Sequence, residues 1–144
     1  MKILVPVDGS DYSMEAVKVA LRYAKATKTD IHLMTVTPFI SGLDLEISAA
    51  AMANLNESMK ARGEEVLSKA QGILKADGVA ANTILSSSIS AADEIIGFAE
   101  KEKVDLIIIG SRGLGGKATR FLMGSVALKV VGNAPCNVYV VKKA

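Results

Sequence analysis

The 144-residue sequence has little of what covalent or metal-stabilised folds require: it contains one cysteine, one histidine, three prolines and no tryptophan. Because Cys136 has no second cysteine to pair with, an internal disulfide is excluded, and a single His32 argues against a Cys/His zinc site or a Cys–His nucleophile pair. We expect Cys136 to be a small buried residue and His32 to be a core or surface histidine rather than a catalytic one. Aromatic residues make up 4% of the chain, so the core must be aliphatic.

Long apolar runs are also missing. Ile3-Leu4-Val5 meets Pro6 and ends at Asp8, which is shorter than the apolar stretch of about 7–15 residues in a secretory signal. No stretch reaches the roughly 18 apolar residues of a membrane-spanning helix. We therefore expect a soluble, cytoplasmic protein with no membrane partner. The length predicts one domain over residues 1–144, and 50% hydrophobic with 22% charged residues is typical of a globular chain.

The charge is nearly balanced overall but unevenly distributed. Seventeen basic and fifteen acidic residues give a net charge of +2, which is too even for a protein that holds nucleic acid by charge alone. Asp105 is the last acid, and six basic residues follow it, so the first 105 residues carry 11 − 15 = −4 and the rest carries +6. Nucleic acid is therefore not expected as a partner, whereas a small anion near the C-terminal quarter is.

Apolar runs of strand length alternate with segments of helical periodicity. Strands are expected at 2–7, 31–36, 81–88, 104–109 and 136–141, and helices at 11–25, 55–76, 90–101 and 125–131. Thr37-Pro38 should close the second strand, because proline removes a ladder donor. Residues 39–56 could be a loop, a lid or the start of the second helix. The strict alternation predicts an α/β fold with one open parallel sheet and helices on both faces.

Two strand ends carry residues suited to binding. Asp8 follows the first strand, and Gly110-Ser-Arg-Gly113-Leu-Gly115-Gly116 follows the fourth, with Gly124-Ser125-Val126 at the start of the last helix. Ligands of open parallel sheets bind beyond such carboxyl ends, and glycines let backbone N–H groups approach phosphate at a helix N-terminus. The plainer interpretation is a strand-to-helix turn. Neither G-x-G-x-x-G after the first strand nor a P-loop motif is present.

These segments, with Ile3-Leu-Val-Pro-Val-Asp-Gly-Ser10 and Asn133-Ala-Pro-Cys-Asn-Val-Tyr-Val-Val141, resemble the universal stress protein family over the whole chain. The resemblance implies a five-stranded parallel sheet of order 3-2-1-4-5, of the Rossmann-like, adenine nucleotide alpha hydrolase-like type. It also implies a homodimer through the last strand, Cys136 to Val141. Members that bind ATP carry the motif G-x2-G-x9-G-[ST].

The same resemblance implies an ATP site, with Mg²⁺ accompanying the nucleotide. Pro6, Asp8 and Val36 would hold the adenosine end. Gly110 and Gly113 would line the ribose and the first phosphates, with the basic Arg112 between them. Gly124, Ser125 and Val126 would receive the outer phosphates.

The sequence departs from the motif in one respect, because ten residues, Leu114 to Met123, separate Gly113 from Gly124. We expect the additional residue to bulge near Lys117-Ala118. Its presence keeps open the alternative of a dimeric stress-response module that binds no nucleotide.

A small enzyme that uses Asp8 is a weaker alternative. Asp11 stands too far from Asp8 for the Asp-x-Asp pattern of haloacid dehalogenase-type phosphatases. No general base is evident near the outer phosphates, so fast ATP hydrolysis is not expected. Slow or partner-stimulated hydrolysis stays open.

Overall fold

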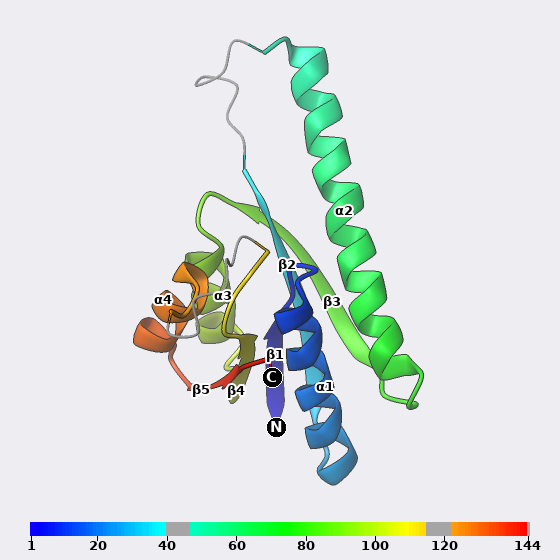
Figure 1. The fold of residues 1–144 in the computed structure, drawn as a ribbon, viewed down its shortest axis with the longest axis vertical. Helices are drawn as coiled ribbons and strands as arrows, with labels where there is room; N and C mark the ends of the chain where they lie inside the picture. The colour runs from blue at the N-terminus through cyan, green and yellow to red at the C-terminus, as the bar shows by residue number, and fades with distance from the viewer. Residues whose placement is uncertain (40–46, 115–121, 144) are drawn as a thin grey trace.

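The computed structural model describes residues 1–39, 47–114 and 122–143, and Figure 1 shows their arrangement. One parallel sheet has the strand order β3-β2-β1-β4-β5. The elements in chain order are β1 (Lys2–Pro6), α1 (Asp11–Ala26), β2 (Asp30–Pro38), α2 (Ala49–Lys75), β3 (Ala81–Ser88), α3 (Ala91–Lys101), β4 (Leu106–Gly110), α4 (Ser125–Asn133) and β5 (Asn137–Val141). The expected fold class and strand order are confirmed.

The central strands are covered on both faces, which is why they read as continuous aliphatic runs. Side chains alternate across a strand, so Ile3 packs with α1 and α2 while Leu4 packs with α3 and α4. Both are fully buried. Figure 1 shows the two helix pairs on opposite sides of the sheet. The aliphatic composition therefore builds two core layers, one on each face.

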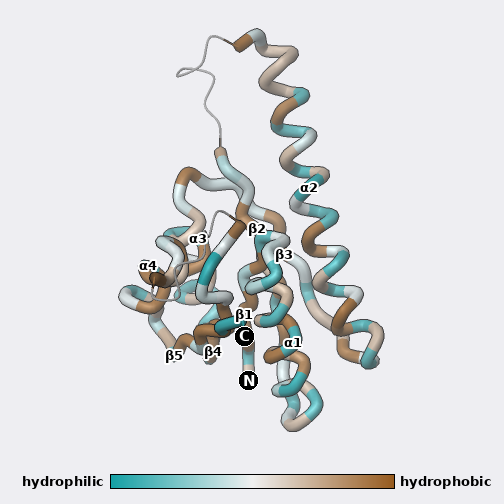
Figure 2. The backbone as a smooth tube through the Cα atoms, in the orientation of Figure 1, coloured by the Kyte–Doolittle hydropathy of each residue, from teal (hydrophilic) through white to brown (hydrophobic). Residues whose placement is uncertain are grey.

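The second helix begins earlier than its periodicity predicts. α2 starts at Ala49, because the Ser48 hydroxyl accepts a hydrogen bond from the Ala51 N–H at 3.1 Å and caps the first turn. Figure 2 shows hydrophobic and hydrophilic residues alternating along this helix. Its first part extends past the end of the sheet in Figure 1. Of the segment left open by the sequence, residues 49–56 are thus helix, and residues 40–46 lie outside the described residues.

The second strand ends at Pro38 as expected, but Thr37 and Pro38 still belong to it, so it runs two residues further than its predicted end at Val36. β2 continues through Pro38, which pairs with Ser88, and the Phe39 N–H then donates to the Ser88 C=O at 3.1 Å. The main-chain N–H and C=O groups of odd-numbered β2 residues therefore point toward β3, and those of even-numbered residues point toward β1. Because β1 has already ended at Pro6, the N–H that Pro38 lacks has no ladder partner to lose.

Two single residues complete the comparison with expectation. Cys136 is only half-buried and directly precedes the edge strand β5, so the expectation of a buried cysteine is wrong. This partial burial raises the pKa of its thiol. His32 Nε2 lies 3.0 Å from Asp30 Oδ2, and its ring stands beside that of Phe98. Across residues 1–39, 47–114 and 122–143, no helix combines the length and apolar character needed to cross a membrane.

Candidate functional site

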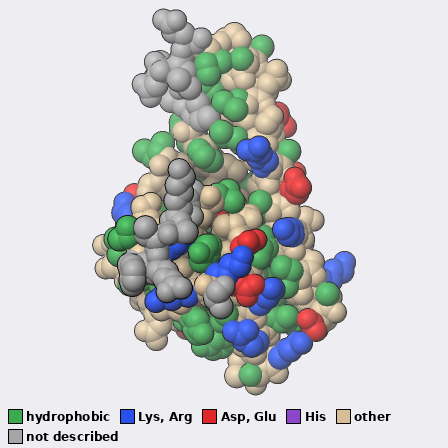
Figure 3. Space-filling model, viewed as in Figure 1, with side chains coloured by type: hydrophobic (Ala, Val, Ile, Leu, Met, Phe, Trp, Pro, Cys, Tyr) green, Lys and Arg blue, Asp and Glu red, His purple; other side chains and the backbone are tan. Residues whose placement is uncertain are grey.

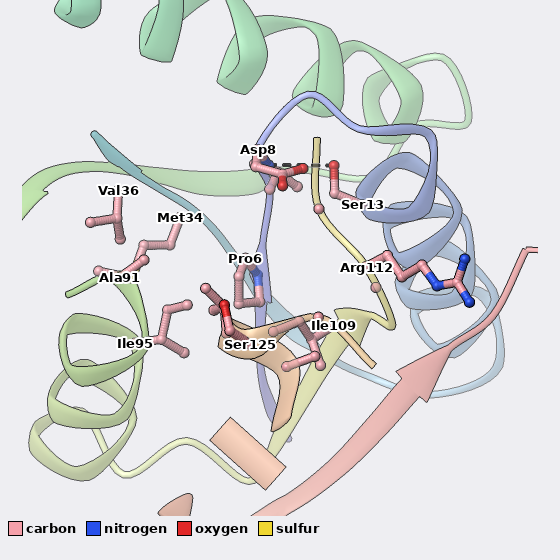
Figure 4. A pocket seen from close by; sticks show the side chains of 16 residues that line it. Pro6, Asp8, Ser13, Met34, Val36, Ala91, Ile95, Ile109, Arg112 and Ser125 are labelled. Atoms are coloured by element: carbon pink, nitrogen blue, oxygen red, sulfur yellow. Dashed lines mark hydrogen bonds between the residues drawn. The ribbon is translucent and has the colours of Figure 1, made fainter. Parts of the chain in front are cut away.

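A cavity of about 440 Å³ opens at the carboxyl end of the sheet, between the sheet and the helices α3 and α4 (Figure 4). This volume lies in the range of small-molecule sites. All nine residues singled out from the sequence border it: Pro6, Asp8, Val36, Gly110, Arg112, Gly113, Gly124, Ser125 and Val126. The sequence therefore located this cavity from segments at opposite ends of the chain.

Seven further lining residues were missed: Val7, Ser13, Met34, Ala91, Ile95, Ile109 and Ala127. Most are aliphatic residues of strands and helices, and only the packing of these elements determines that their side chains point into the cavity. Met34 and Ile95 are each 2% exposed and Ile109 is 5% exposed, so they form a dry floor. Such a floor suits the flat, largely apolar face of an aromatic ring.

Asp8 is held in a hydrogen-bonded turn between β1 and α1. Its Oδ1 accepts a hydrogen bond from the Ser10 N–H at 2.9 Å, and its N–H donates to the Ser13 hydroxyl at 3.4 Å (Figure 4). The Ser13 hydroxyl in turn donates to the Ser10 C=O at 2.9 Å. Gly9 has φ of +87°, a left-handed conformation that glycine adopts without strain. The turn fixes the one carboxylate among the described residues that line the cavity.

Close approaches of backbone explain two of the glycines. A Cβ atom on Gly110 would lie 2.8 Å from the carbonyl carbon of Tyr12, in the first turn of α1. A Cβ atom on Gly113 would lie 2.7 Å from Asp8 Oδ2. Both distances are shorter than a side chain tolerates, so the strand β4 and the residues after it can pack against the β1–α1 turn only because these positions carry no side chain.

The N-terminus of α4 differs from the starts of the other three helices in the described residues. Ser10, Ser48 and Ser90 each cap a helix with a side-chain hydrogen bond, whereas Gly124 at the start of α4 makes none. The first N–H groups of a helix have no intrahelical partners and carry a partial positive charge. Because Ser125, Val126 and Ala127 border the cavity, these uncapped donors could be satisfied there by an anion.

The main chain of Val36 offers a second set of hydrogen-bonding groups. The Val7 N–H donates to the Met34 C=O at 2.8 Å, so even residues of β2 turn their N–H and C=O toward β1. Val36 is the next even residue and lies beyond Pro6, where β1 ends. Its N–H and C=O therefore point past the end of that strand, beside the dry floor.

Arg112 borders the cavity but is directed differently from the other polar groups. Its Nε donates to the Leu122 C=O at 3.1 Å. In Figure 4 its guanidinium points away from Asp8 and Ser125. The basic residues Lys117 and Arg120, and the expected bulge near Lys117-Ala118, lie outside the described residues.

No cluster of three or more potential metal ligands occurs in the described part of the chain. Two ion pairs are made by residues that do not line the cavity. Lys129 on α4 lies 2.9 Å from Asp93 on α3, and this hydrogen bond lowers the pKa of Asp93. Lys143 lies 2.8 Å from Asp11 at the start of α1 and lowers the pKa of that carboxyl in the same way. On the face drawn in Figure 3, basic side chains are interspersed with acidic ones.

Comparisons with known proteins agree with this arrangement. The family model described as "Universal stress protein family" matches residues 1–142. Universal stress protein MJ0531 of Methanocaldococcus jannaschii is 41% identical over an alignment of 145 positions, which covers 99% of this chain and 82% of that protein. The structure of UspA from Lactobacillus plantarum is 26% identical, with a TM-score of 0.82 and coverage of 98% of this chain and 97% of that one.

A universal stress protein solved in complex with cAMP is also 26% identical, with a TM-score of 0.74 over 100% of this chain and 98% of that one. The matches span nearly the full chain and include both halves of the cavity. The chain therefore belongs to the universal stress protein family.

Proposed function

We propose that this protein is a cytoplasmic, regulatory stress-response protein that binds ATP in the cavity at the carboxyl end of the sheet. The observation that carries the proposal is that the Asp8 carboxylate and the uncapped N-terminus of α4 border the same cavity. A nucleotide needs both: acceptors for its ribose hydroxyls and donors for its phosphates. The relative solved with cAMP supports the adenine nucleotide class.

Base selection follows from the direction of the Val36 main chain. Adenine presents an amino donor next to a ring-nitrogen acceptor, which match one peptide C=O and one peptide N–H. Guanine presents the opposite order on the same edge, so it would leave both groups of Val36 unpaired at a cost of about 1–3 kcal/mol each. Met34 and Ile95 would bury the ring between aliphatic side chains.

The residues present fit Mg²⁺ only as a companion of the nucleotide. Mg²⁺ takes six oxygen ligands and keeps several waters, and Asp8 is the single carboxylate among the described lining residues. Phosphate oxygens and water would therefore supply most of the coordination. The ion would neutralise the phosphate charge, while this chain holds the ribose at Asp8 and the phosphates at the start of α4.

Regulation would pass through a homodimer made by β5. The Ser111 N–H donates to the Val141 C=O at 2.8 Å. The main-chain N–H and C=O groups of odd-numbered β5 residues therefore point toward β4, and those of even-numbered residues point outward. Val138 and Val140 therefore expose unpaired backbone groups at the sheet edge, where a second copy could pair with them. The Ser111 C=O also accepts from the Gly124 N–H at 2.7 Å, so Ser111 is hydrogen-bonded both to the proposed phosphate site and to the proposed dimer strand.

Thermal melting with and without millimolar Mg-ATP tests the proposal. A ligand present at about 100 times its Kd stabilises the folded state by about 2.7 kcal/mol, which raises Tm by several degrees. Mg-GTP should raise Tm less than Mg-ATP. No shift with Mg-ATP would instead favour the dimeric module that binds no nucleotide, the alternative suggested by the ten-residue spacing before Gly124.

A further inference from the structure

A pair of hydrogen bonds joins the two ends of the segment between β4 and α4, which runs from Ser111 to Gly124. The Gly124 N–H donates to the Ser111 C=O at 2.7 Å, and the Arg112 Nε–H donates to the Leu122 C=O at 3.1 Å. The backbones also touch, because a Cβ atom on Gly124 would lie 3.3 Å from the Arg112 Cα. We call these contacts the loop clamp. It connects residues 111–112 with residues 122–124.

The clamp lies between the two proposed contact points for phosphate. Gly113 follows Arg112 directly, and Gly124 is the N-cap residue that precedes α4. Their relative position is therefore fixed by bonds near the ends of the segment. The ten-residue spacing between Gly113 and Gly124 therefore does not require either glycine to change its position.

The direction of the Arg112 side chain separates two possible roles. If Arg112 bound phosphate directly, its guanidinium would point toward the uncapped N-terminus of α4, where the phosphate is proposed to lie. Instead, Nε is used on the Leu122 C=O, and Figure 4 shows the guanidinium turned away from Ser125. From this geometry we propose that Arg112 is a positioning residue for nucleotide binding, which acts through its Nε–H on Leu122 rather than through its charge. The proposal rests on the proposed function of the cavity.

Arg112→Gln and Arg112→Lys distinguish a hydrogen-bonding role from a charge role, because they place different atoms at the position of the arginine Nε. Glutamine carries an amide N–H donor the same number of bonds from Cα as the arginine Nε, but it has no charge. Lysine keeps the charge but has a methylene group at that position. Arg112→Gln therefore preserves the hydrogen bond to the Leu122 C=O without the cation, and Arg112→Lys preserves the cation without that hydrogen bond.

Hydrogen exchange of the Gly124 amide tests the clamp in nucleotide-free protein. Loss of a typical hydrogen bond should speed exchange about three- to tenfold in Arg112→Lys and Arg112→Ala, with Arg112→Gln within about twofold of the unaltered protein. Thermal melting of each variant separates this local effect from global unfolding. Protection of Gly124 in Arg112→Lys equal to that of the unaltered protein would overturn the positioning role of Arg112.

Affinity for Mg-ATP and for adenosine, measured by titration calorimetry on the same variants, tests the consequence. Arg112→Lys and Arg112→Ala should bind Mg-ATP about three- to tenfold more weakly, Arg112→Gln should bind it normally, and adenosine affinity should not change. Normal binding by Arg112→Lys with weak binding by Arg112→Gln would identify a charge contact and overturn the proposal. If the unaltered protein bound no nucleotide, the proposed function would fail, while the exchange data would still decide whether Arg112 clamps the loop.

Discussion

The Oδ2 atom of Asp8 lies 2.7 Å from the position that a Cβ atom would occupy on Gly113. The Ser10 N–H holds the other carboxylate oxygen of Asp8 at 2.9 Å, so the carboxylate cannot turn aside without losing that bond. The two walls of the cavity, one from each end of the chain, therefore meet at a point where only glycine fits.

This contact predicts the effect of a side chain at Gly113. Gly113→Val should lower Mg-ATP affinity at least tenfold, because the added methyl groups displace Asp8 and occupy the space where phosphate approaches. Gly124→Val should act similarly, since its Cβ meets the Arg112 backbone at 3.3 Å. Calorimetric titration with Mg-ATP measures both.

Gly132→Val is the matched control on α4. Apart from its chain neighbours and the backbone of its own helix, nothing lies within 4 Å of a Cβ built on Gly132, so the ATP affinity of this variant should equal that of the unaltered protein. Circular dichroism should show the same fold in all three variants. Unchanged ATP affinity in both Gly113→Val and Gly124→Val would contradict the proposed site.

A second prediction concerns the exposed edge at β5. Val138→Pro removes an N–H that faces outward, so it should leave the pairing with β4 intact but turn a β5-mediated dimer into monomers. Tyr139→Pro should instead destabilise the fold, because it removes an N–H that faces β4 and the edge-on contact of Tyr139 with the Tyr23 ring. Size-exclusion chromatography with light scattering distinguishes the two. A dimer that persists in Val138→Pro points to another surface.

A third prediction concerns the pH dependence of the Asp11–Lys143 pair. The hydrogen bond from Lys143 lowers the pKa of Asp11, and the reverse interaction raises the pKa of Lys143. The contribution of Asp11 to stability is therefore present above its unfolded pKa of about 3.9 and is lost as pH falls through the lower folded value. The contribution of Lys143 is present below about pH 10.4 and is lost as pH rises through its raised value.

Lys143→Ala should move the pKa of Asp11 back up toward its ordinary value, whereas Lys142→Ala, at a neighbouring exposed residue, should not. Titration of the Asp11 side-chain carboxyl carbon by NMR measures this directly. An Asp11 pKa that is identical in Lys143→Ala and the unaltered protein would show that the pair does not form in solution. Because both groups are exposed, global stability should change little.

The parallel α/β fold and the location of the cavity could be predicted because they depend on local signals, whereas the strand order was implied by the resemblance to the universal stress protein family. Aliphatic runs end at Asp8 and Gly110, and both ends lie at the same edge of a parallel sheet.

What could not be predicted depends on tertiary packing. Ala49 to Leu55 lacks the periodicity of a packed helix because it extends beyond the sheet, so only its Ser48 cap marks the start of α2. In the sequence, Ile95 looks like any other buried aliphatic residue of a helix, so its place in the cavity floor could not be recognised. The direction of Arg112 depends on the Leu122 carbonyl, which is set by the return of the chain toward α4.

The two edges of the sheet have different chemistry. β3 ends in Ser86-Ser87-Ser88, whereas β5 carries Val138, Tyr139 and Val140. Pairing of two β5 strands about a two-fold axis would leave only the hydroxyl-rich β3 edges exposed at both ends of a ten-stranded sheet, since each copy contributes five strands. Such edges offer little apolar surface to a third copy. The sheet would therefore terminate its own growth at two subunits rather than extend into a fibre.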